Sequence, residues 1–233
     1  MFRVYPSDCL IGVDQPPPIS DTITRVSVQS LQDIQMRIIH EEVLINRGDI
    51  AETEEWRTIY AEIHQAIDAV VWPPGSDQFI INPALHGNGV KPIKDGCMIA
   101  LREKFGWRIE APVFIRESSK PGKVDAVRST PLGDFVFEWE TGNISSSHRS
   151  LNKIVLGLIR ELIIGGVLVL PTRKLYPYLT DRVGNYEELF PYFPVWKRIP
   201  VQRGIMIVIA VEQDLTDGQI PLIRKGTDGR ALV

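Results

Sequence analysis

A strand–helix–strand succession in the second half of the chain restricts the fold more than any other feature. The segment DFVFEWE, residues 134–140, is followed by a helical stripe of apolar residues and then by the wholly apolar run VLVLP, residues 167–171. The stripe predicts a helix over about 146–164, capped by Ser145 and ended by the pair Gly165–Gly166. A wholly apolar strand is typical of burial on both faces, and a helical crossover makes the two strands parallel.

Further strand candidates lie on both sides of this unit. RIEAPVFI (residues 108–115) and KVDAVR (residues 123–128) are bounded by the turn-forming sequences SSKPGK and STPLG, which favour an antiparallel meander into DFVFEWE. GIMIVIAV, residues 204–211, is another buried strand candidate. The expected fold class is therefore α/β, with a central mixed sheet flanked by helices.

The N-terminal half is expected to be mainly helical. Leu31, Ile34 and Ile38 recur at helical spacing, and a longer stripe over residues 56–70 predicts a second helix that ends before the sequence WPPG. A third helix is expected over about 93–105, closed by a left-handed glycine.

The predicted domain organisation is simple. Residues 1–20 include the tract QPPPIS, whose prolines favour an extended N-terminal arm, and residues 21–233 are expected to form a single domain. Between the second and third helices, the loop NPALHGNGVKP, residues 82–92, lacks the context of a nucleotide-binding loop and is interpreted as structural.

Composition excludes some classes of protein and leaves others open. The formal net charge of −3 does not exclude DNA, because a net value is silent about a local basic patch. Cys9 and Cys97 have no metal-binding spacing, and the sequence contains neither a signal segment nor an apolar run near 18 residues. We therefore expect a cytoplasmic protein without a membrane partner.

Three carboxylates are candidates for a metal site. Glu138 and Glu140 are two residues apart on a strand, so both face the same side, and antiparallel pairing would bring Asp125 beside them. A hard cation such as Mg²⁺ relieves the repulsion between such carboxylates. A bare E-x-E pattern is more often a solvated face or a partner for lysines.

The polar sequence after the strand is a candidate phosphate site. SSSHR, residues 145–149, opens the predicted helix with free backbone donors, hydroxyl groups and one arginine, Arg149. His148 lies in this first turn, where a histidine is more often a capping or surface residue, and we leave it out of catalysis. Carboxylates followed at once by an anion site favour a metal-dependent phosphodiesterase.

These residues resemble the BamHI-type type II restriction endonucleases of the PD-(D/E)XK nuclease superfamily. The resemblance rests on D-x12-E-x-E followed by TGNISSSHRSLNK, and it extends to NGVKPIK, LTDRV, NYEELFPYF and PLIRKGTDG. It covers roughly residues 70–229 and implies a restriction-endonuclease-like core, so that residues 21–233 would be a nuclease domain.

The resemblance implies roles for particular residues. The implied catalytic residues are Glu110, Asp125, Glu138, Glu140 and Lys94, of which Asp125, Glu138 and Glu140 would bind Mg²⁺, with Mn²⁺ able to substitute. Glu140 stands where the superfamily usually has lysine, which suggests a base or metal ligand, and either Glu140 or Glu110 could activate the water. The implied DNA-binding residues are Asn143, Ser145, Arg149, Asp181, Arg182 and Asp228.

The resemblance also implies a substrate and an assembly. Arginine suits guanine, asparagine suits adenine and aspartate suits cytosine in the major groove. The expected target is GGATCC in double-stranded DNA, cut after the first G to leave four-base 5′ overhangs by a homodimer. A cognate DNA methyltransferase would protect the host genome without needing to bind the enzyme. The alternatives are another GATC-centred site and a DNA-binding protein that does not cleave.

Overall fold

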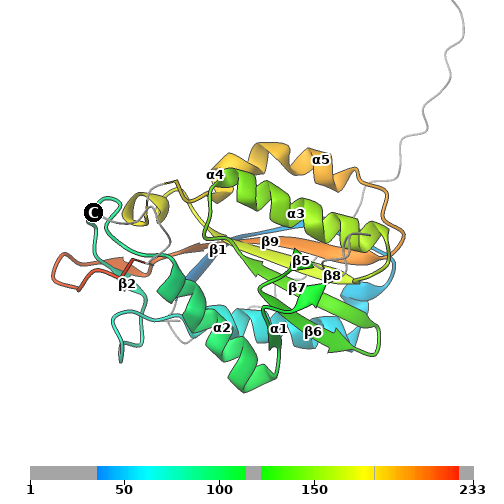
Figure 1. Ribbon diagram of the computed structural model, residues 1–233, viewed down its shortest axis with the longest axis horizontal. Helices are drawn as coiled ribbons and strands as arrows, with labels where there is room; N and C mark the ends of the chain where they lie inside the picture. The colour runs from blue at the N-terminus through cyan, green and yellow to red at the C-terminus, as the bar shows by residue number, and fades with distance from the viewer. Residues whose placement is uncertain (1–35, 114–121, 181, 226–233) are drawn as a thin grey trace, which may run out of the picture. The chain divides into compact units, whose positions relative to one another are not determined.

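A mixed sheet of six strands organises the described part of the chain, in the order β1–β9–β8–β7–β6–β3 (Figure 1). This computed structural model describes residues 36–113, 122–180 and 182–225, which belong to one compact unit beginning at Asp33. The strands are β1 (Arg37–Arg47), β3 (Arg108–Ile109), β6 (Ala126–Thr130), β7 (Gly133–Trp139), β8 (Gly165–Pro171) and β9 (Gly204–Glu212).

The pairing of the central strands confirms the predicted strand–helix–strand unit. Strands β7, β8 and β9 are mutually parallel, with Phe137 opposite Val167 and Val167 opposite Ile207. Strand β6 is antiparallel to β7, as the STPLG turn predicts, and β3 and β1 extend the sheet antiparallel at its two edges. The fold class is therefore the expected α/β arrangement.

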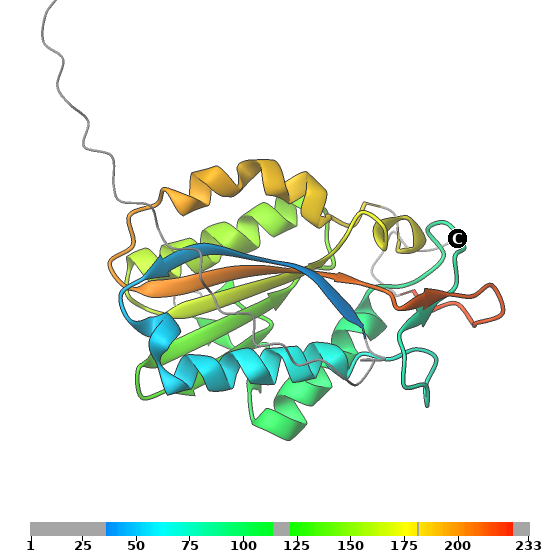
Figure 2. The ribbon, with the colours of Figure 1, turned by 180° about the vertical axis from the view of Figure 1, so that it is seen from behind.

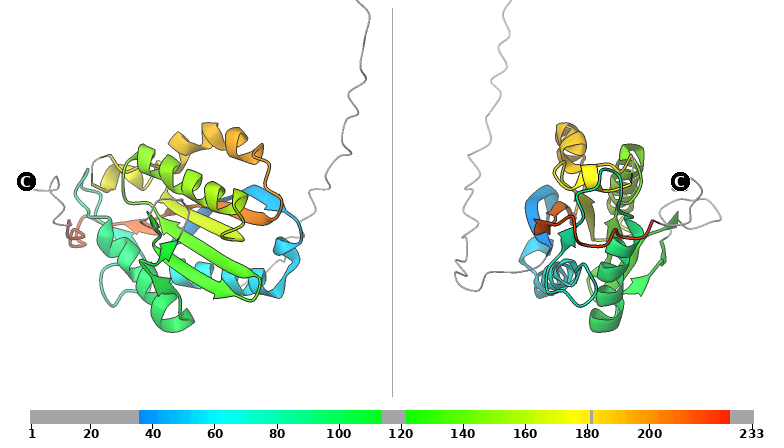
Figure 3. Two further views of the ribbon diagram at one scale, coloured as in Figure 1. Left: turned by 45° about the vertical axis from the view of Figure 1, so that its right-hand side comes forward. Right: turned by 90° about the vertical axis from the view of Figure 1, so that its left-hand side faces the viewer.

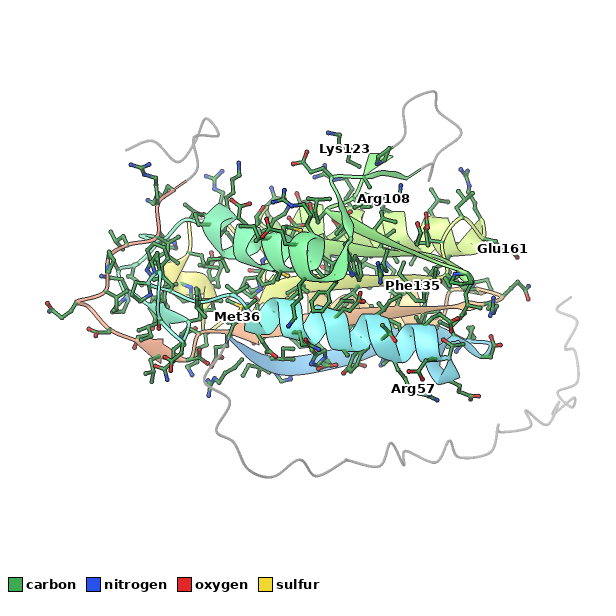
Figure 4. The ribbon with its side chains drawn as sticks, turned by 90° about the horizontal axis from the view of Figure 1, so that it is seen from below. Met36, Arg57, Arg108, Lys123, Phe135 and Glu161 are labelled. Atoms are coloured by element: carbon green, nitrogen blue, oxygen red, sulfur yellow. The ribbon has the colours of Figure 1, made fainter. Side chains whose placement is uncertain are left out.

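Helices cover both faces of the sheet (Figures 1 and 2). One face carries α3 (Ile144–Ile159), α4 (Tyr186–Leu189) and α5 (Phe193–Lys197), and the other carries α1 (Glu54–Asp68) and α2 (Lys91–Phe105). Figure 3 shows the sheet between these two helical layers, and Figure 4 shows α1 and α2 over the lower face.

Alternate residues of β7 pack against different layers. Phe135 stacks on Trp56 of α1 with ring centroids 5.9 Å apart, and Phe137 meets Trp107 edge-on at 6.3 Å. Val136 packs in the other core cluster, with the apolar residues of α3. Because side chains alternate along a strand, Glu138 also faces α3, whereas Phe137 and Trp139 are buried in the core on the opposite face.

Short strands and single-turn helices lie outside the six-stranded sheet. Strand β2 (Ile80–Ile81) pairs in parallel with β10 (Leu215–Thr216). Residues between η2 (Tyr176–Tyr178) and α4 form the loop that leads to Arg182. Further single-turn helices are η1 (Ile50–Glu52) and η3 (Phe190–Tyr192). Within the described ranges, no helix is long and apolar enough to span a membrane.

The helix expected around Leu31, Ile34 and Ile38 is wrong where the structure describes it. Ile38 lies in strand β1, opposite Val211 of β9, while Leu31 and Ile34 fall outside the described residues. Most side chains of β1 are exposed or only partly buried, so its sequence lacks the strict alternation of a half-buried strand.

The predicted ends of α3 need correction. Asn143 caps the helix, since its side chain accepts a hydrogen bond from the backbone N–H of Ser146 at 3.2 Å, and Ser145 lies inside the first turn. The helix ends at Ile159, and Glu161 adopts a positive φ of 55°. Gly165 and Gly166 belong to β8 and therefore do not end the helix.

The predicted strand RIEAPVFI is also interrupted. In its described part, residues 108–113, β3 and β4 (Pro112–Val113) are separated by Glu110, whose positive φ of 49° breaks the strand, and Phe114 and Ile115 lie outside the described residues. Strand β4 pairs with β5 (Gly122–Lys123), and Asp125 lies in a bend between β5 and β6 where the sequence predicted the middle of a strand.

Candidate active site

The side chain of Asp125, which lies in the bend before β6, is held against the end of strand β7. One carboxylate oxygen, Oδ2, accepts a hydrogen bond from the backbone N–H of Trp139 at 2.7 Å, and the other, Oδ1, lies 2.5 Å from Nζ of Lys94. Its backbone carbonyl accepts a hydrogen bond from the N–H of Glu110 at 2.8 Å. The bend thus places the predicted catalytic residues Lys94, Glu110 and Asp125 beside one another.

Glu138 is nearly buried between β7 and α3. Its side chain forms an ion pair with Lys153 of α3, whose ammonium group also donates a hydrogen bond to the carbonyl of Lys123 at 2.9 Å. Burial raises the pKa of Glu138 to about 7, and the negative charge of Asp125 acts in the same direction, while Lys153 and Lys94 oppose the rise.

Glu140 follows the last residue of β7 and supports the turn into α3. Its Oε1 accepts a hydrogen bond from the N–H of Gly142 at 2.6 Å, and Ser150 donates to Oε2 at 3.5 Å. Burial raises the pKa of this carboxyl group too, and the hydrogen bond from Gly142 opposes the rise. Both glutamates therefore face α3, as their spacing predicts.

An open cleft of about 290 Å³ lies next to Asp125. Helix α2 lines one side with Lys94 and Arg102, while Glu110 and Asp125 line the other. The Glu110 side chain is 75% exposed and forms an ion pair with Lys123, with Oε2 and Nζ 3.5 Å apart. Carboxylates and cations thus line the same cleft, and the cations are suited to binding a phosphate group.

Carboxylates are the type of donor that a hard cation prefers, but here their charges are balanced by lysines. Within the described ranges, no group of three or more His, Cys, Asp or Glu residues has an arrangement that could hold a metal ion. Instead, Lys94 and Lys153 compensate the charges of Asp125 and Glu138. Carboxylate oxygens are ligands that Mg²⁺ uses in proteins, so the type of donor is compatible with Mg²⁺, although these side chains pair with lysines in this arrangement.

The predicted DNA-binding residues are distributed over two adjoining segments. Asn143, Ser145 and Arg149 lie at the start of α3, where Arg149 donates to the hydroxyl of Ser146 at 3.0 Å. Arg182 has a φ of 70°, and its loop joins the same region through a hydrogen bond of 2.8 Å from the N–H of Gly184 to the carbonyl of Gly142. Asp181 and Asp228 lie outside the described residues.

Lys153 was not among the predicted site residues. It lies in the LNK sequence, one helical turn beyond Arg149, and this spacing on a helix that starts beside the carboxylates is the signal that could have identified it. His148, which we left out of catalysis, packs between rings, with centroids 4.7 Å from Tyr192 and 5.3 Å from Trp196.

A mixed sheet with buried carboxylates at the end of β7, beside lysines and an open cleft, is the arrangement expected of a restriction-endonuclease-like fold. The family model "Restriction endonuclease BamHI" matches residues 36–230. The chain therefore belongs to the BamHI family of restriction endonucleases, and it is a type II site-specific deoxyribonuclease.

Two curated relatives support this assignment. The chain is 50% identical to the type II restriction enzyme OkrAI of Oceanobacter kriegii over 197 residues, which cover 84% of this chain and 100% of the relative. It is 38% identical to the type II restriction enzyme BamHI of Bacillus amyloliquefaciens over 177 residues, covering 73% of this chain and 81% of the relative.

Among solved structures, the chain is similar to the restriction endonuclease BglII complexed with a DNA 16-mer. The TM-score is 0.45 at 13% identity, over 80% of this chain and 90% of that one.

Proposed function

We propose that the enzyme cleaves both strands of GGATCC after the first G, in the cytoplasm, with Mg²⁺ as its metal and Mn²⁺ as a possible substitute. One observation supports the proposed hydrolysis most directly. At the end of β7, Asp125 pairs with Lys94 and Glu138 pairs with Lys153. The two curated relatives, both type II restriction enzymes, support the choice of DNA as substrate.

Asp125, Glu138 and Glu140 are the residues that would hold the metal. When bound there, Mg²⁺ would lower the pKa of a water molecule and offset negative charge on the phosphate. Lys94 lines the cleft and pairs with Asp125, which supports a role for its ammonium group in orienting the scissile phosphate. Lys153 would keep the Glu138 carboxylate in its ionised form.

Glu110 and Glu140 are the two candidates for orienting the attacking water or accepting its proton. Glu110 is exposed and lines the cleft, which favours access to water. Glu140 is buried, and its oxygens accept hydrogen bonds from Gly142 and Ser150, which favours a fixed position. A carboxylate in either place could perform general base catalysis.

A homodimer would match the two-fold symmetry of a palindromic site, because each protomer provides one set of catalytic carboxylates and must cut one strand. Sedimentation of the enzyme bound to its duplex would check this: two protomers per duplex are expected, and one protomer per cleaved duplex would exclude the proposal.

Base recognition is assigned to Asn143, Ser145, Arg149 and Arg182, together with Asp181 and Asp228. The first four lie on the start of α3 and the loop joined to it, which supports a shared role. Arginine can bind O6 and N7 of guanine in two hydrogen bonds, and asparagine can bind N6 and N7 of adenine. These chemistries are compatible with GGATCC.

Cleavage of a random-sequence library tests the specificity. Wild-type enzyme should select GGATCC, whereas Arg182→Ala should lose about 1 to 3 kcal/mol of discrimination, mainly at an outer G·C pair. Arg57→Ala is a matched control, because Arg57 is exposed on α1 and pairs with Glu54. Selection of another GATC-centred site would replace GGATCC, and wild-type cleavage at sites without GATC would contradict the specificity.

A further inference from the structure

Asn88, in the HGNG sequence before α2, is completely buried at 0% exposure. Its side-chain Nδ2 donates to the carbonyls of Asn82 at 2.8 Å and Tyr178 at 2.9 Å, and its Oδ1 accepts from the N–H of Ile223 at 3.1 Å. One side chain thus contacts its own loop, the last residue of η2 and the segment after β10. No residue of α3 or of the catalytic set takes part in these bonds.

Backbone hydrogen bonds join the same three segments. The N–H of Asn88 donates to Tyr178 at 2.9 Å, and the carbonyl of Asn88 accepts from Thr180 at 2.8 Å, so that Asn88 and Leu179 form a parallel bridge. The N–H of Gly89 donates to the carbonyl of Ile223 at 2.9 Å. The loop over residues 82–90 is therefore held between the other two segments along its length.

Gly89 leaves no space for a side chain at this junction. A Cβ atom on Gly89 would lie 2.1 Å from the carbonyl oxygen of Arg224 and 2.8 Å from Cα of Lys225. Both contacts are with backbone, which cannot turn aside as a flexible side chain can. A methyl group here would have to displace the chain at Arg224 and Lys225.

Each of the three segments is followed in the chain by residues to which the proposed function gives a role. Thr180 comes directly before the segment of Asp181 and Arg182, Lys225 lies three residues before Asp228, and Asn88 lies three residues before α2, which carries Lys94. We propose that Asn88 is a positioning residue for DNA specificity, fixing residues 178–180, which lead to Arg182, and residues 223–225 against the start of α2. This inference rests on the proposed base-reading role of those segments.

The chemistry of Asn88 suits this role. A side-chain amide has an NH₂ group that donates and an oxygen that accepts. In Asn88 the NH₂ group donates to two carbonyls and the oxygen accepts from one N–H. In Asn88→Asp the side chain keeps its shape and its acceptor but loses both donors, so the carbonyls of Asn82 and Tyr178 would face a carboxylate. We expect the contacts among these three segments to loosen while the six-stranded sheet stays intact.

Binding and cleavage of Asn88→Asp and Gly89→Ala test the proposal. The matched controls are Asn46→Asp, on an exposed part of β1, and Gly218→Ala, where a Cβ meets nothing within 4 Å. The probes are the duplex that wild-type enzyme selects from a random library, singly altered versions of it, and an unrelated duplex. Binding is measured without metal over a range of salt concentrations, and kcat/KM is measured with Mg²⁺.

Both junction variants should bind the selected duplex about ten-fold or more weakly and lose discrimination in kcat/KM, whereas the controls behave as wild type. Affinity for the unrelated duplex and its dependence on salt should not change, because nonspecific binding depends on phosphate contacts. Hydrogen exchange should speed up at residues 177–180 and 222–225 but not in β7, β8 or β9.

Wild-type discrimination in both variants would overturn the proposal. So would equal losses for the selected and unrelated duplexes, or unfolding of both variants, because either result means that Asn88 supports the whole unit. If the wild-type enzyme selects a sequence other than GGATCC, the proposed specificity fails, but the role of Asn88 is still judged on that sequence.

Discussion

Lys153 is the residue that most strongly favours the ionised form of Glu138. Burial raises the pKa of this glutamate to about 7, and the positive charge and hydrogen bond of Lys153 oppose the rise. An ionised carboxylate is required to bind a metal ion. The activity should therefore depend on Lys153 even though its ammonium group points to a carboxylate and not into the cleft.

Lys153→Met keeps the apolar stem and removes the charge, so it should raise the pKa of Glu138 further. The acidic limb of the profile of kcat/KM against pH is then expected to move to higher pH, because Glu138 is protonated over a wider range. Lys197→Met is the control, since Lys197 pairs with Glu42 on β1. An unmoved acidic limb, or the same movement in the control, would contradict the role of Lys153.

At the scale of residues, the sequence predicted the carboxylates but not their partners. Alternation along a strand places Glu138 and Glu140 on one face whatever surrounds them. The contact between Lys153 and Glu138 depends on how α3 packs on β7, and a helical position alone does not determine that packing. The same limit applies to Asn143, since either it or Ser145 is a suitable helix cap.

At the scale of elements, two glycines of β8 allow α3 and β7 to lie close to it. A Cβ on Gly166 would be 2.4 Å from Cγ2 of Ile154 in α3, and a Cβ on Gly165 would be 2.3 Å from Cδ1 of Phe135 in β7. Ile154 is the neighbour of Lys153 along the helix, so the closeness of α3 to the sheet also positions the partner of Glu138.

Gly166→Ala should lower the free energy of unfolding by about 1 to 3 kcal/mol, because the added methyl group overpacks the core against Ile154. Gly218→Ala, which enters open space, should change it by less than about 0.5 kcal/mol. Urea denaturation measures both. Equal midpoints for Gly166→Ala and the wild-type protein would show that α3 does not need this close approach.

Elements with a strong periodic pattern could be predicted, and those without one could not. Helices α1 and α2 and strands β7, β8 and β9 each bury a continuous face or run, so period and length identify them. Strand β1 pairs with β9 through its backbone while most of its side chains remain exposed, so its pairing leaves little trace in the sequence.

At the scale of the whole molecule, the site depends on segments far apart in the chain. Lys94 comes from α2, Asp125 from the bend before β6, Glu138 from β7 and Lys153 from α3. The net charge of −3 does not describe this region, where two lysines lie beside the carboxylates. Family membership explains why the sequence points to a candidate site, because the family's motifs mark segments that come together only in the folded chain.

Cleavage and binding by Glu138→Ala together test the central claim, that the carboxylates at the end of β7 hold the metal for DNA hydrolysis. Wild-type enzyme should linearise a plasmid carrying its site with Mg²⁺ and not with a chelator. Glu138→Ala should be about a thousand-fold slower or more, since several kcal/mol of transition-state stabilisation depend on the metal, yet bind the site specifically. Glu54→Ala, an exposed change on α1, should cleave normally. Full cleavage by Glu138→Ala in Mg²⁺ would contradict the claim.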